Sequence, residues 1–403
     1  MARTPQFSTS MNRRQFLKLS GGGLVAIVGA NFLNGCSPAA MAPTSAPQPT
    51  TPPQPVATTP PIAAPTVKVG GTVDFLSWEG YDLPTCMADW NKAHSVTFSS
   101  SYIGDHNEIQ AKLTSGQSVG YDMVTYYQGY SDMYVNDLKL LQPIDTNIVT
   151  NFADLYERFR TGQAWLKDGK VWGAPFTWGA EGCNYNADKI DPPQSWKDLL
   201  QPKFKGQVGM IDVMIDEIIH GGLILGYGDK LPNLTTAELA EVKKFLLDMK
   251  KQTRSIAASY GDLTDQLVSG EIVVTFPGWA AVNVWAQQRN TNVRITIPSE
   301  GTYSFCDALA VPVHADNEAT AMAWINEALS PSVQACQAKA LSAGVVNPKA
   351  VPLLDKDIAA MYDYAHLEDF FKKAPFYTMP PQKSDQYATY DQWTAAWEEV
   401  KAA

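Results

Sequence analysis

The feature that most constrains the fold of this chain is a repeated alternation between strand-like and helix-like segments after residue 67. The alternation begins with the strand pattern GTVDFLS and the helix pattern LPTCMADWNKAHS, and continues through VTFSSSYIG, NEIQAKLTSG and YDMVTYY. It returns in TTAELAEVKKFLLDMKKQT and DLTDQLVSGEIVVTFPGW, and long strands are expected near residues 174–186 and 303–312. Such alternation favours a parallel sheet with helices on both faces. We therefore predict two α/β lobes that are connected by long strands.

The composition is that of an acidic, largely globular protein. Its 403 residues are 45% hydrophobic, and 41 Asp and Glu against 31 Lys and Arg give a formal net charge of -10. An acidic surface is a poor partner for nucleic acid or anionic lipid, so neither is expected to bind. The sequence contains no HExxH motif, no Cys/His cluster at metal spacing, and no GxSxG, P-loop or strand-linked GxGxxG pattern. We therefore expect no metal, no other cofactor and no enzymatic activity.

Residues 1–35 have the pattern of an export signal. A basic start is followed by a glycine-rich apolar stretch that is too short for a stable transmembrane span. The motif RRQFLK, which begins at Arg13, resembles a twin-arginine export signal, and LNGC resembles a lipoprotein processing site at which Cys36 is lipidated. Residues 36–67 are rich in Pro, Thr and Ala and are expected to form a disordered tether. The alternative is an ordinary secretory signal with chance arginines.

An exported chain of this kind is expected on the periplasmic side of the inner membrane, where disulfide bonds can form. Four cysteines follow the tether: Cys86, Cys183, Cys306 and Cys336. They allow three full pairings, between which the sequence does not choose, and buried free thiols are an equal alternative. The choice between Met1 and Met11 as the start of the chain also stays open.

Aromatic and acidic side chains follow the expected strands, where a cleft between the lobes would lie. Open α/β sheets bind ligands at the carboxyl ends of their strands. The candidate residues there are Trp78, Glu79, Tyr81, Tyr127, Tyr130, Asp212, Asp216, Phe276, Trp279, Phe305 and Asp307. Aromatic faces and carboxylates together suit an organic ammonium ligand, through cation–π contacts and charge-assisted hydrogen bonds. The alternatives are an aromatic loop that packs on its own lobe and, for Asp216, a side chain that caps the next helix.

Asp307 is the most unusual of these residues, because it interrupts the apolar strand SFCDALAVP. A carboxylate in a buried strand is costly unless a cation or several hydrogen-bond donors meet it. Strand alternation places Phe305 on the same side of the strand as Asp307. We therefore expect a cation or several hydrogen-bond donors to meet Asp307.

The order of these segments resembles that of periplasmic substrate-binding proteins of ABC importers, and the similarity is greatest to the spermidine/putrescine-binding type. The matching stretches are FLSWEGYD, AKLTSGQSVGYDMV, APFTWGAEGCNYN, SWKDLLQPKFKGQVGMID, LVSGEIVVTFPGW and FCDALAVP, which together span nearly the whole body of the chain. The resemblance implies a type II, two-lobed periplasmic-binding-protein fold with interleaved lobes and hinge strands that cross near residues 178–179 and 306–307. The implied lobes are residues 68–178 with 307–355, and residues 179–306 with 356–403.

The resemblance also implies roles for single residues. Asp307 matches an aspartate that holds a ligand amine, and Asp216 matches an acid at the other end of the cleft. The other matches are cleft aromatics and a C-terminal polar contact, with phenylalanine at two positions where the family has tryptophan: Trp78, Tyr81, Phe276, Phe305 and Gln382.

The chain departs from the family pattern where the polyamine binders carry an acid or a tyrosine. The residues at these positions are Gly80, Gly129, Val213 and Val345. Glu79 or Glu181 is a candidate for a replacement charge. Fewer acids and smaller side chains also suit a shorter amine or a zwitterion.

The expected function is that of a lipid-anchored, monomeric receptor that closes on a small cationic amine of the putrescine and spermidine class and presents it to an ABC permease. Three alternatives remain at this point. The same fold could bind γ-aminobutyrate or another amino acid or small solute. The chain could instead be an exported enzyme, or a structural or sensory lipoprotein that transports nothing.

Overall fold

The computed structural model describes residues 68–103, 106–114 and 120–403. The predicted export signal, the lipidation site at Cys36 and the tether lie outside the described residues. Within the described part of the chain, no helix is both long enough and apolar enough to cross a membrane.

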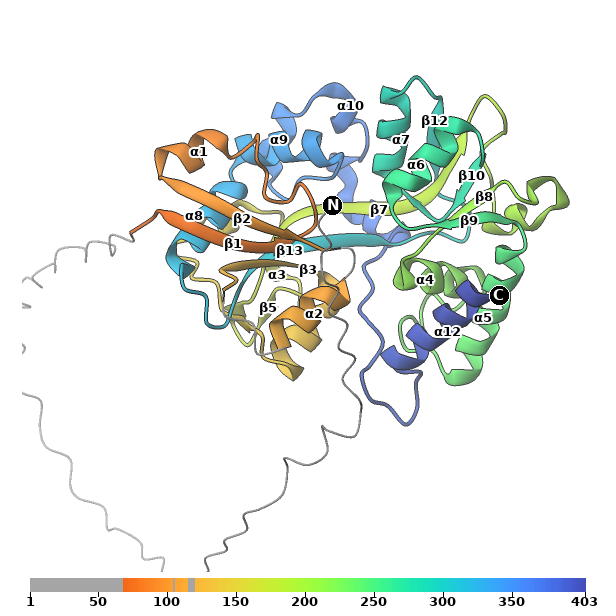
Figure 1. The fold of residues 1–403 in the computed structure, drawn as a ribbon, viewed down its shortest axis with the longest axis horizontal. Coiled ribbons are helices and arrows are strands. Elements are labelled where there is room, and N and C mark those ends of the chain that lie inside the picture. The colour runs from red at the N-terminus through yellow and green to blue at the C-terminus, as the bar shows by residue number, and fades with distance from the viewer. Residues whose placement is uncertain (1–67, 104–105, 115–119) are drawn as a thin grey trace, which may run out of the picture. The chain divides into compact units, whose positions relative to one another are not determined.

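The main sheet runs in the order β2-β1-β3-β13-β7-β10-β8-β9 (Figure 1). Its strands, in that order, are Val96–Tyr102, Gly71–Ser77, Met123–Tyr127, Ser304–Pro312, Ala174–Asn186, Val274–Phe276, Val208–Ile211 and Thr253–Ala257. The shorter strands are β4 (Leu141–Gln142), β11 (Gly278–Trp279) and β12 (Val293–Thr296) beside this sheet, and β5 (Leu166–Lys167) with β6 (Lys170–Val171) as a separate pair. β1 pairs in parallel with β2 and β3, and β8 pairs in parallel with β9 and β10. The predicted α/β organisation with parallel strands is confirmed.

Two long strands connect these two groups of parallel strands. Residues 174–180 of β7 pair with β13, whereas residues 181–186 pair with β10, β11 and β12. Residues 307–310 of β13 also pair with β3 in the first group. β7 and β13 therefore run from one group of strands to the other (Figure 1).

The two predicted hinge positions lie opposite each other in this ladder. Phe305 faces Gly179 across the strand pair, and Cys306 faces Trp178. All of β7 is buried, although it carries the polar residues Thr177, Glu181, Asn184 and Asn186. The exact lobe boundaries around these positions stay a prediction.

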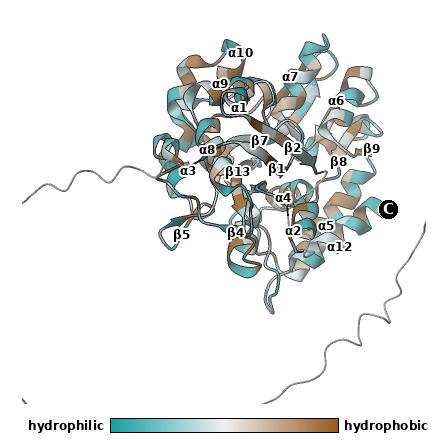
Figure 2. Ribbon diagram, turned by 60° about the vertical axis from the view of Figure 1, so that its left-hand side comes forward, coloured by the Kyte–Doolittle hydropathy of each residue, from teal (hydrophilic) through white to brown (hydrophobic). Residues whose placement is uncertain are grey.

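Helices cover the sheet and place the loops at its strand ends. Their bounds are α1 Ala88–Ala93, α2 His106–Thr114, α3 Glu157–Thr161, α4 Met214–Ile224, α5 Thr236–Lys250, α6 Tyr260–Ser269, α7 Ala280–Gln288, α8 Glu318–Ala328, α9 Pro331–Leu341, α10 Lys356–Ala359, α11 Leu367–Lys373 and α12 Tyr390–Ala402. α8 packs on β1 and β13, α9 packs on β7, and α4 and α6 pack on β8. Hydrophobic residues gather on the central strands, while the helices carry both hydrophobic and hydrophilic residues (Figure 2), as expected for helices with one buried face.

Local sequence explains where several helices begin. Thr235 caps α5, and the Glu238 side chain returns a bond to the Thr235 backbone, so the predicted amphipathic helix is confirmed. The helix expected from LPTCMADWNKAHS is shorter than predicted, because Leu83 has a left-handed backbone (φ 46) and α1 begins only at Ala88. The segment SWKDLLQPKFKG forms two 3-10 turns; Ser195 caps the first, and Pro202 begins the second.

The cysteines divide into one disulfide and two free thiols. Cys86, just before α1, is bonded to Cys336 on α9, which is 250 residues away in sequence. Cys183 on β7 and Cys306 on β13 are free and buried. The structure thus selects one pair and two free thiols from the alternatives that the sequence left open.

We predict that replacing both Cys86 and Cys336 by Ala lowers the free energy of unfolding by about 2–5 kcal/mol, because the bond closes a very long loop in the unfolded chain. Thermal unfolding of the folded body with and without reductant measures this effect. Reductant should lower the melting temperature of the wild type and leave that of the double variant unchanged. Equal melting temperatures for oxidised wild type and double variant would contradict the prediction.

Candidate functional site

Asp307 lies on β13 at the crossing of the two strand groups. Its side chain is only 5% exposed, and the Tyr81 hydroxyl donates a hydrogen bond to Oδ2 at 2.6 Å. Tyr81 follows β1 in a turn closed by its N–H on the Trp78 carbonyl, and its ring packs edge-on against Phe176. Burial raises the pKa of Asp307 to about 6, and the Tyr81 hydrogen bond opposes part of that rise. One neutral donor thus meets a carboxylate that burial makes costly to ionise.

Asp216 is a second buried carboxylate, located in the first turn of α4. Tyr260, the first residue of α6, donates to Oδ2 at 2.5 Å, and the Tyr303 hydroxyl donates to Oδ1. Burial raises the pKa of Asp216 to about 6, although both tyrosine hydrogen bonds lower it. The N-cap position of α4 is Val213, which makes no side-chain cap, so Asp216 does not cap the helix. The alternative role for Asp216 is therefore wrong.

Glu181 lies on β7, paired with Trp279 of β11, and is 2% exposed. Burial, followed by the charge of Asp216, raises the pKa of Glu181 well above its usual value. The Tyr260 hydroxyl, which donates to Asp216 Oδ2, opposes part of this rise. Glu181 Oε2 is buried and has no hydrogen-bond partner among the described residues.

No basic side chain of the described residues neutralises these carboxylates. The ion pairs in this part of the chain include none of Asp307, Asp216 and Glu181. The nearby His220 contacts the Asp216 carbonyl and the Thr302 hydroxyl, and burial lowers its pKa to about 4, so its ring is neutral at pH 7. The site therefore carries acids and neutral donors but no cation of its own.

Tyr127, at the end of β3, is paired with Asp307 in the ladder between β3 and β13. Its hydroxyl donates to the Tyr377 carbonyl at 3.1 Å. Burial first, then the charges of Asp216, Asp307 and Glu181, raise the pKa of Tyr127. The charges of Asp307, Asp216 and Glu181 therefore all disfavour ionisation of Tyr127.

Two groups of aromatic rings flank the acids. In the first, the His106 ring lies 5.2 Å from Trp78, 5.8 Å from Tyr127 and 5.0 Å from Tyr130, measured between centroids. Burial lowers the pKa of His106 to about 3, so this ring is also neutral. Tyr130 in turn lies 3.1 Å from the Tyr390 hydroxyl, oxygen to oxygen.

In the second group, the Trp279 ring lies 5.8 Å from Tyr260 and 5.7 Å from Phe305. A side chain at Gly179 would collide with Phe305 and with the Trp279 indole, because a Cβ there would lie 2.6 Å and 2.8 Å from their nearest atoms. Glycine at the strand crossing therefore lets both rings approach the backbone beside Asp307.

The structure brings most of the predicted residues together. Those around the acids and the two aromatic groups are Trp78, Tyr81, Tyr127, Tyr130, Glu181, Asp216, Trp279, Phe305 and Asp307. Three residues of the same surroundings were not predicted: His106, Tyr260 and Tyr303. His106 follows β2 and Tyr260 follows β9, so the strand-end rule, applied further, would have found these two, whereas Tyr303 immediately precedes β13 and needs the folded structure.

Four predicted residues lie elsewhere. Phe276 is fully buried and packs on Trp196 and Phe245, since its strand β10 lies inside the sheet, so it belongs to the core. Asp212 accepts from Trp397 at 2.8 Å and pairs with Lys401 at 3.0 Å, so its charge is already satisfied. Glu79 and Gln382 are exposed and are not among the residues that contact these acids.

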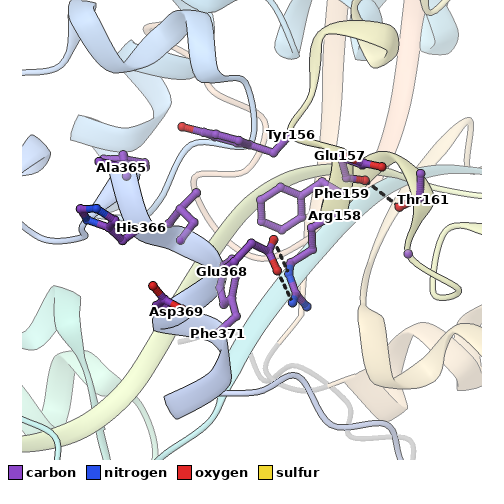
Figure 3. A pocket seen from close by; sticks show the side chains of 13 residues that line it. Tyr156, Glu157, Arg158, Phe159, Thr161, Ala365, His366, Glu368, Asp369 and Phe371 are labelled. Atoms are coloured by element: carbon purple, nitrogen blue, oxygen red, sulfur yellow. Dashed lines mark hydrogen bonds and ion pairs between the residues drawn. The ribbon is translucent and has the colours of Figure 1, made fainter.

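A cavity of about 730 Å³ lies apart from the acids, between α3 and α11 (Figure 3). Arg158 at its edge pairs with Glu368 at 2.8 Å, and its guanidinium lies 5.0 Å from the centre of the Phe371 ring. None of the buried acids lines it. No group of three or more His, Cys, Asp and Glu able to hold a metal occurs in the described residues.

Comparisons with known proteins agree with this architecture. Residues 85–367 match the family described as bacterial extracellular solute-binding protein. The spermidine/putrescine-binding periplasmic protein of Escherichia coli is 26% identical over 294 residues, which covers 72% of this chain and 81% of the relative.

Solved structures give the same result for the fold. A putative spermidine/putrescine ABC transporter protein from Listeria monocytogenes has a TM-score of 0.69 at 20% identity, covering 82% of this chain and 98% of that one. A GABA receptor has a TM-score of 0.63 at 19% identity, covering 82% and 96%. The predicted α/β, two-lobed periplasmic-binding-protein fold is confirmed. The chain belongs to the bacterial extracellular solute-binding protein family.

Proposed function

We propose that this chain is the substrate-binding component of an ABC importer. Its ligand would be a small amine, either one with two ammonium groups, such as putrescine, or spermidine. One observation carries the proposal: Asp307 at one end, and Asp216 with Glu181 at the other, are buried without a basic partner among the described residues. Removing an ion from water costs several kcal/mol unless a counter-charge meets it. An ammonium group at each end supplies that counter-charge.

The surroundings of the acids also fit an amine. A primary ammonium group donates three hydrogen bonds, and the free oxygen Oε2 of Glu181 is an unused acceptor. The neutral rings of Trp78, Tyr130 and Trp279 offer apolar faces for methylene groups and π faces for a cation. The names of relatives that carry spermidine and putrescine agree with this chemistry.

A zwitterion such as γ-aminobutyrate is the second candidate. Two buried nitrogen atoms, Trp279 Nε1 and His106 Nδ1, have no hydrogen-bond partner in the described chain and could contact a ligand carboxylate. The similarity to a GABA receptor also favours this candidate. The charge balance opposes it, because a ligand carboxylate would enter a site that holds several acids and no Lys or Arg. We therefore rank the diamine first.

The proposed mechanism is closure about the paired hinge positions on β7 and β13. Asp307 and Tyr81 approach the ligand from the side of β1 and β3, and Asp216 and Tyr260 approach it from the side of α4 and α6. A ligand that contacts both sides stabilises the closed form over the open one, since only the closed form offers all contacts. This is binding and release without chemistry, in agreement with relatives that are solute-binding proteins.

The proposal includes the cellular setting. An export signal at residues 1–35 and a lipid on Cys36 would hold a monomeric receptor at the periplasmic side of the inner membrane, near its permease. The names of relatives as periplasmic proteins support the compartment.

The direct test is calorimetric titration of residues 68–403, after unfolding and refolding to remove co-purified ligand. We expect stoichiometric binding of putrescine or spermidine, and weak or no binding of γ-aminobutyrate, neutral amino acids and sulfate. Tight binding of γ-aminobutyrate alone would replace the diamine by the second candidate. Turnover of any of these compounds would overturn the receptor function.

Asp307→Asn should weaken diamine binding by about 2–5 kcal/mol, because the variant leaves one ligand ammonium group buried without its charge partner. The amide keeps the size of the side chain and can still accept from Tyr81. Asp168→Asn is the matched control: it removes the same charge from an exposed turn with a left-handed backbone that Asn tolerates. If both variants bind putrescine as the wild type does, Asp307 is not in the site.

The same variant should have the opposite effect on the stability of the ligand-free protein. The pKa of Asp307 is raised to about 6, so its carboxyl favours the folded state below its unfolded pKa and loses that contribution as pH rises through 6. At pH 7.5, Asp307→Asn should therefore stabilise the ligand-free protein by up to about 3 kcal/mol, and at pH 4 by almost nothing. The comparison must be between variant and wild type, because the lowered pKa values of His106 and His220 act in the opposite direction.

Calorimetric melting temperatures at the two pH values measure this difference. A variant that is less stable than the wild type at pH 7.5 would show that Asp307 is favourably solvated in the ligand-free protein.

A further inference from the structure

Asp307 and Glu181 belong to one face of the sheet. Asp307 of β13 pairs with Thr177 of β7, and Glu181 of β7 pairs with Trp279 of β11. Opposite residues of an antiparallel pair lie on the same face, and so do alternate residues along one strand. Thr177 and Glu181 are an even number of positions apart on β7. The side chains of Asp307, Glu181 and Trp279 therefore share this face.

The surroundings of Gly179, halfway between these two positions, agree with this arrangement. Phe305 is its partner on β13. A Cβ atom on Gly179 would lie 2.6 Å from the Phe305 ring and 2.8 Å from Trp279 Nε1, so both rings lie where a side chain of Gly179 would point. The two ring centroids are 5.7 Å apart. The rings therefore lie between the position of Asp307 and that of Glu181.

This face keeps surface and polar atoms that the described chain does not use. Phe305 and Trp279 are half-buried, whereas β7 is buried throughout. Glu181 Oε2 is buried and has no hydrogen-bond partner among the described residues. The face thus presents one carboxylate, two aromatic rings and a second carboxylate, in that order.

Asp216 lies at the Glu181 end of this face. The Glu181 backbone N–H donates to the Tyr303 carbonyl at 3.1 Å, and the Tyr303 hydroxyl donates to Asp216 Oδ1. Tyr303 thus contacts the backbone of one acid and the side chain of the other. Asp307 is the acid of the opposite end.

The spacing along β7 sets the length of a ligand that reaches both Asp307 and Glu181. At 3.2–3.4 Å per residue, the four positions from Thr177 to Glu181 span about 13 Å, and strand side chains stand roughly perpendicular to the sheet. An ammonium nitrogen lies about 2.8 Å from its carboxylate oxygen, so two nitrogens between the carboxylates are at least about 7 Å apart.

Of the two amines in question, only the longer one covers this span. With bond lengths near 1.5 Å and angles near 111°, an extended chain advances about 1.25 Å per bond. This gives about 6 Å between the nitrogens of putrescine and about 11 Å between the terminal nitrogens of spermidine. Putrescine is therefore too short to contact both carboxylates.

We propose that this face selects a polyamine of the length of spermidine, with one terminal ammonium group on Asp307 and the other on Glu181. The secondary ammonium group between them lies against the rings of Phe305 and Trp279, which offer cation–π contacts. The inference rests on the proposed function and deepens it, because it chooses the longer amine and assigns its far end to Glu181.

Calorimetric titration of residues 68–403 with putrescine, 1,8-diaminooctane and spermidine tests the length. 1,8-Diaminooctane has as many bonds between its terminal nitrogens as spermidine but no central nitrogen, so it separates length from central charge. We expect both long amines to bind at least about tenfold more tightly than putrescine. We expect spermidine to bind about 3- to 30-fold more tightly than 1,8-diaminooctane.

The outcomes distinguish this inference from the proposed function. If putrescine binds as tightly as the long amines, the length selection is overturned and the amine receptor remains. If 1,8-diaminooctane binds as tightly as spermidine, the rings do not hold the central charge. If none of the three amines binds, the proposed function fails and the inference fails with it.

Glu181→Gln tests the assignment of the far end. The affinity loss should be at least about fivefold larger for the two long amines than for putrescine, since only the long amines reach this position. Glu271→Gln is the matched control, because it removes the same charge from an exposed position between α6 and β10. It should bind all three amines as the wild type does. An equal loss for the three amines in Glu181→Gln, or no loss, overturns the role of Glu181.

Phe305→Leu tests the central charge, because leucine keeps an apolar side chain and removes the π face. The variant should reduce the preference for spermidine over 1,8-diaminooctane, while both long amines still bind more tightly than putrescine. An unchanged ratio between spermidine and 1,8-diaminooctane would show that the Phe305 ring does not contact the secondary ammonium group.

Discussion

Buried carboxylates without a basic partner are the constraint on which the rest of the site depends. Asp307, Asp216 and Glu181 are all buried, and in the part of the chain that the structure describes only tyrosine hydroxyls donate to the side chains of Asp307 and Asp216. Neutral donors reduce the cost of burying a charge but do not supply a counter-charge. The tyrosines around them therefore position the acids, and the free energy to be gained from a cation remains available to a ligand.

The sheet determines where these acids meet. β7 and β13 belong to both groups of strands, so a residue on either strand lies where the two groups join. Asp307 lies at this junction on β13. Glu181 lies there on β7, next to the point where the pairing partner of β7 changes from β13 to β11. Asp216 lies in the first turn of α4, and this helix begins three residues after the end of β8. In the proposed mechanism, closure about these strands would change the distance between Asp307 and the side chains of Asp216 and Glu181.

Much of this could be predicted from strand ends alone. Asp307 was visible as an acid in an apolar strand, and Tyr81, Tyr127 and Asp216 lie at or just after the carboxyl ends of β1, β3 and β8. The rule failed for Phe276 and Asp212, which also end strands or follow them. The Phe276 side chain packs in the core, and Asp212 pairs with Lys401 on a helix more than 180 residues later. The direction in which a side chain points and a partner that is distant in sequence decide such cases, and the local sequence specifies neither.

By itself, the sequence determined the α/β class, the two long connecting strands and the chemical character of the site, because periodicity and strand-end residues depend on neighbours along the chain. The tertiary structure decided the pairing of Cys86 with Cys336 and the assignment of Asp212 to an ion pair. It also decided that the Tyr260 and Tyr303 hydroxyls both donate to Asp216. These side chains come from α6, the residue before β13 and α4, and only the folded packing of distant elements brings two tyrosine hydroxyls to one buried carboxylate.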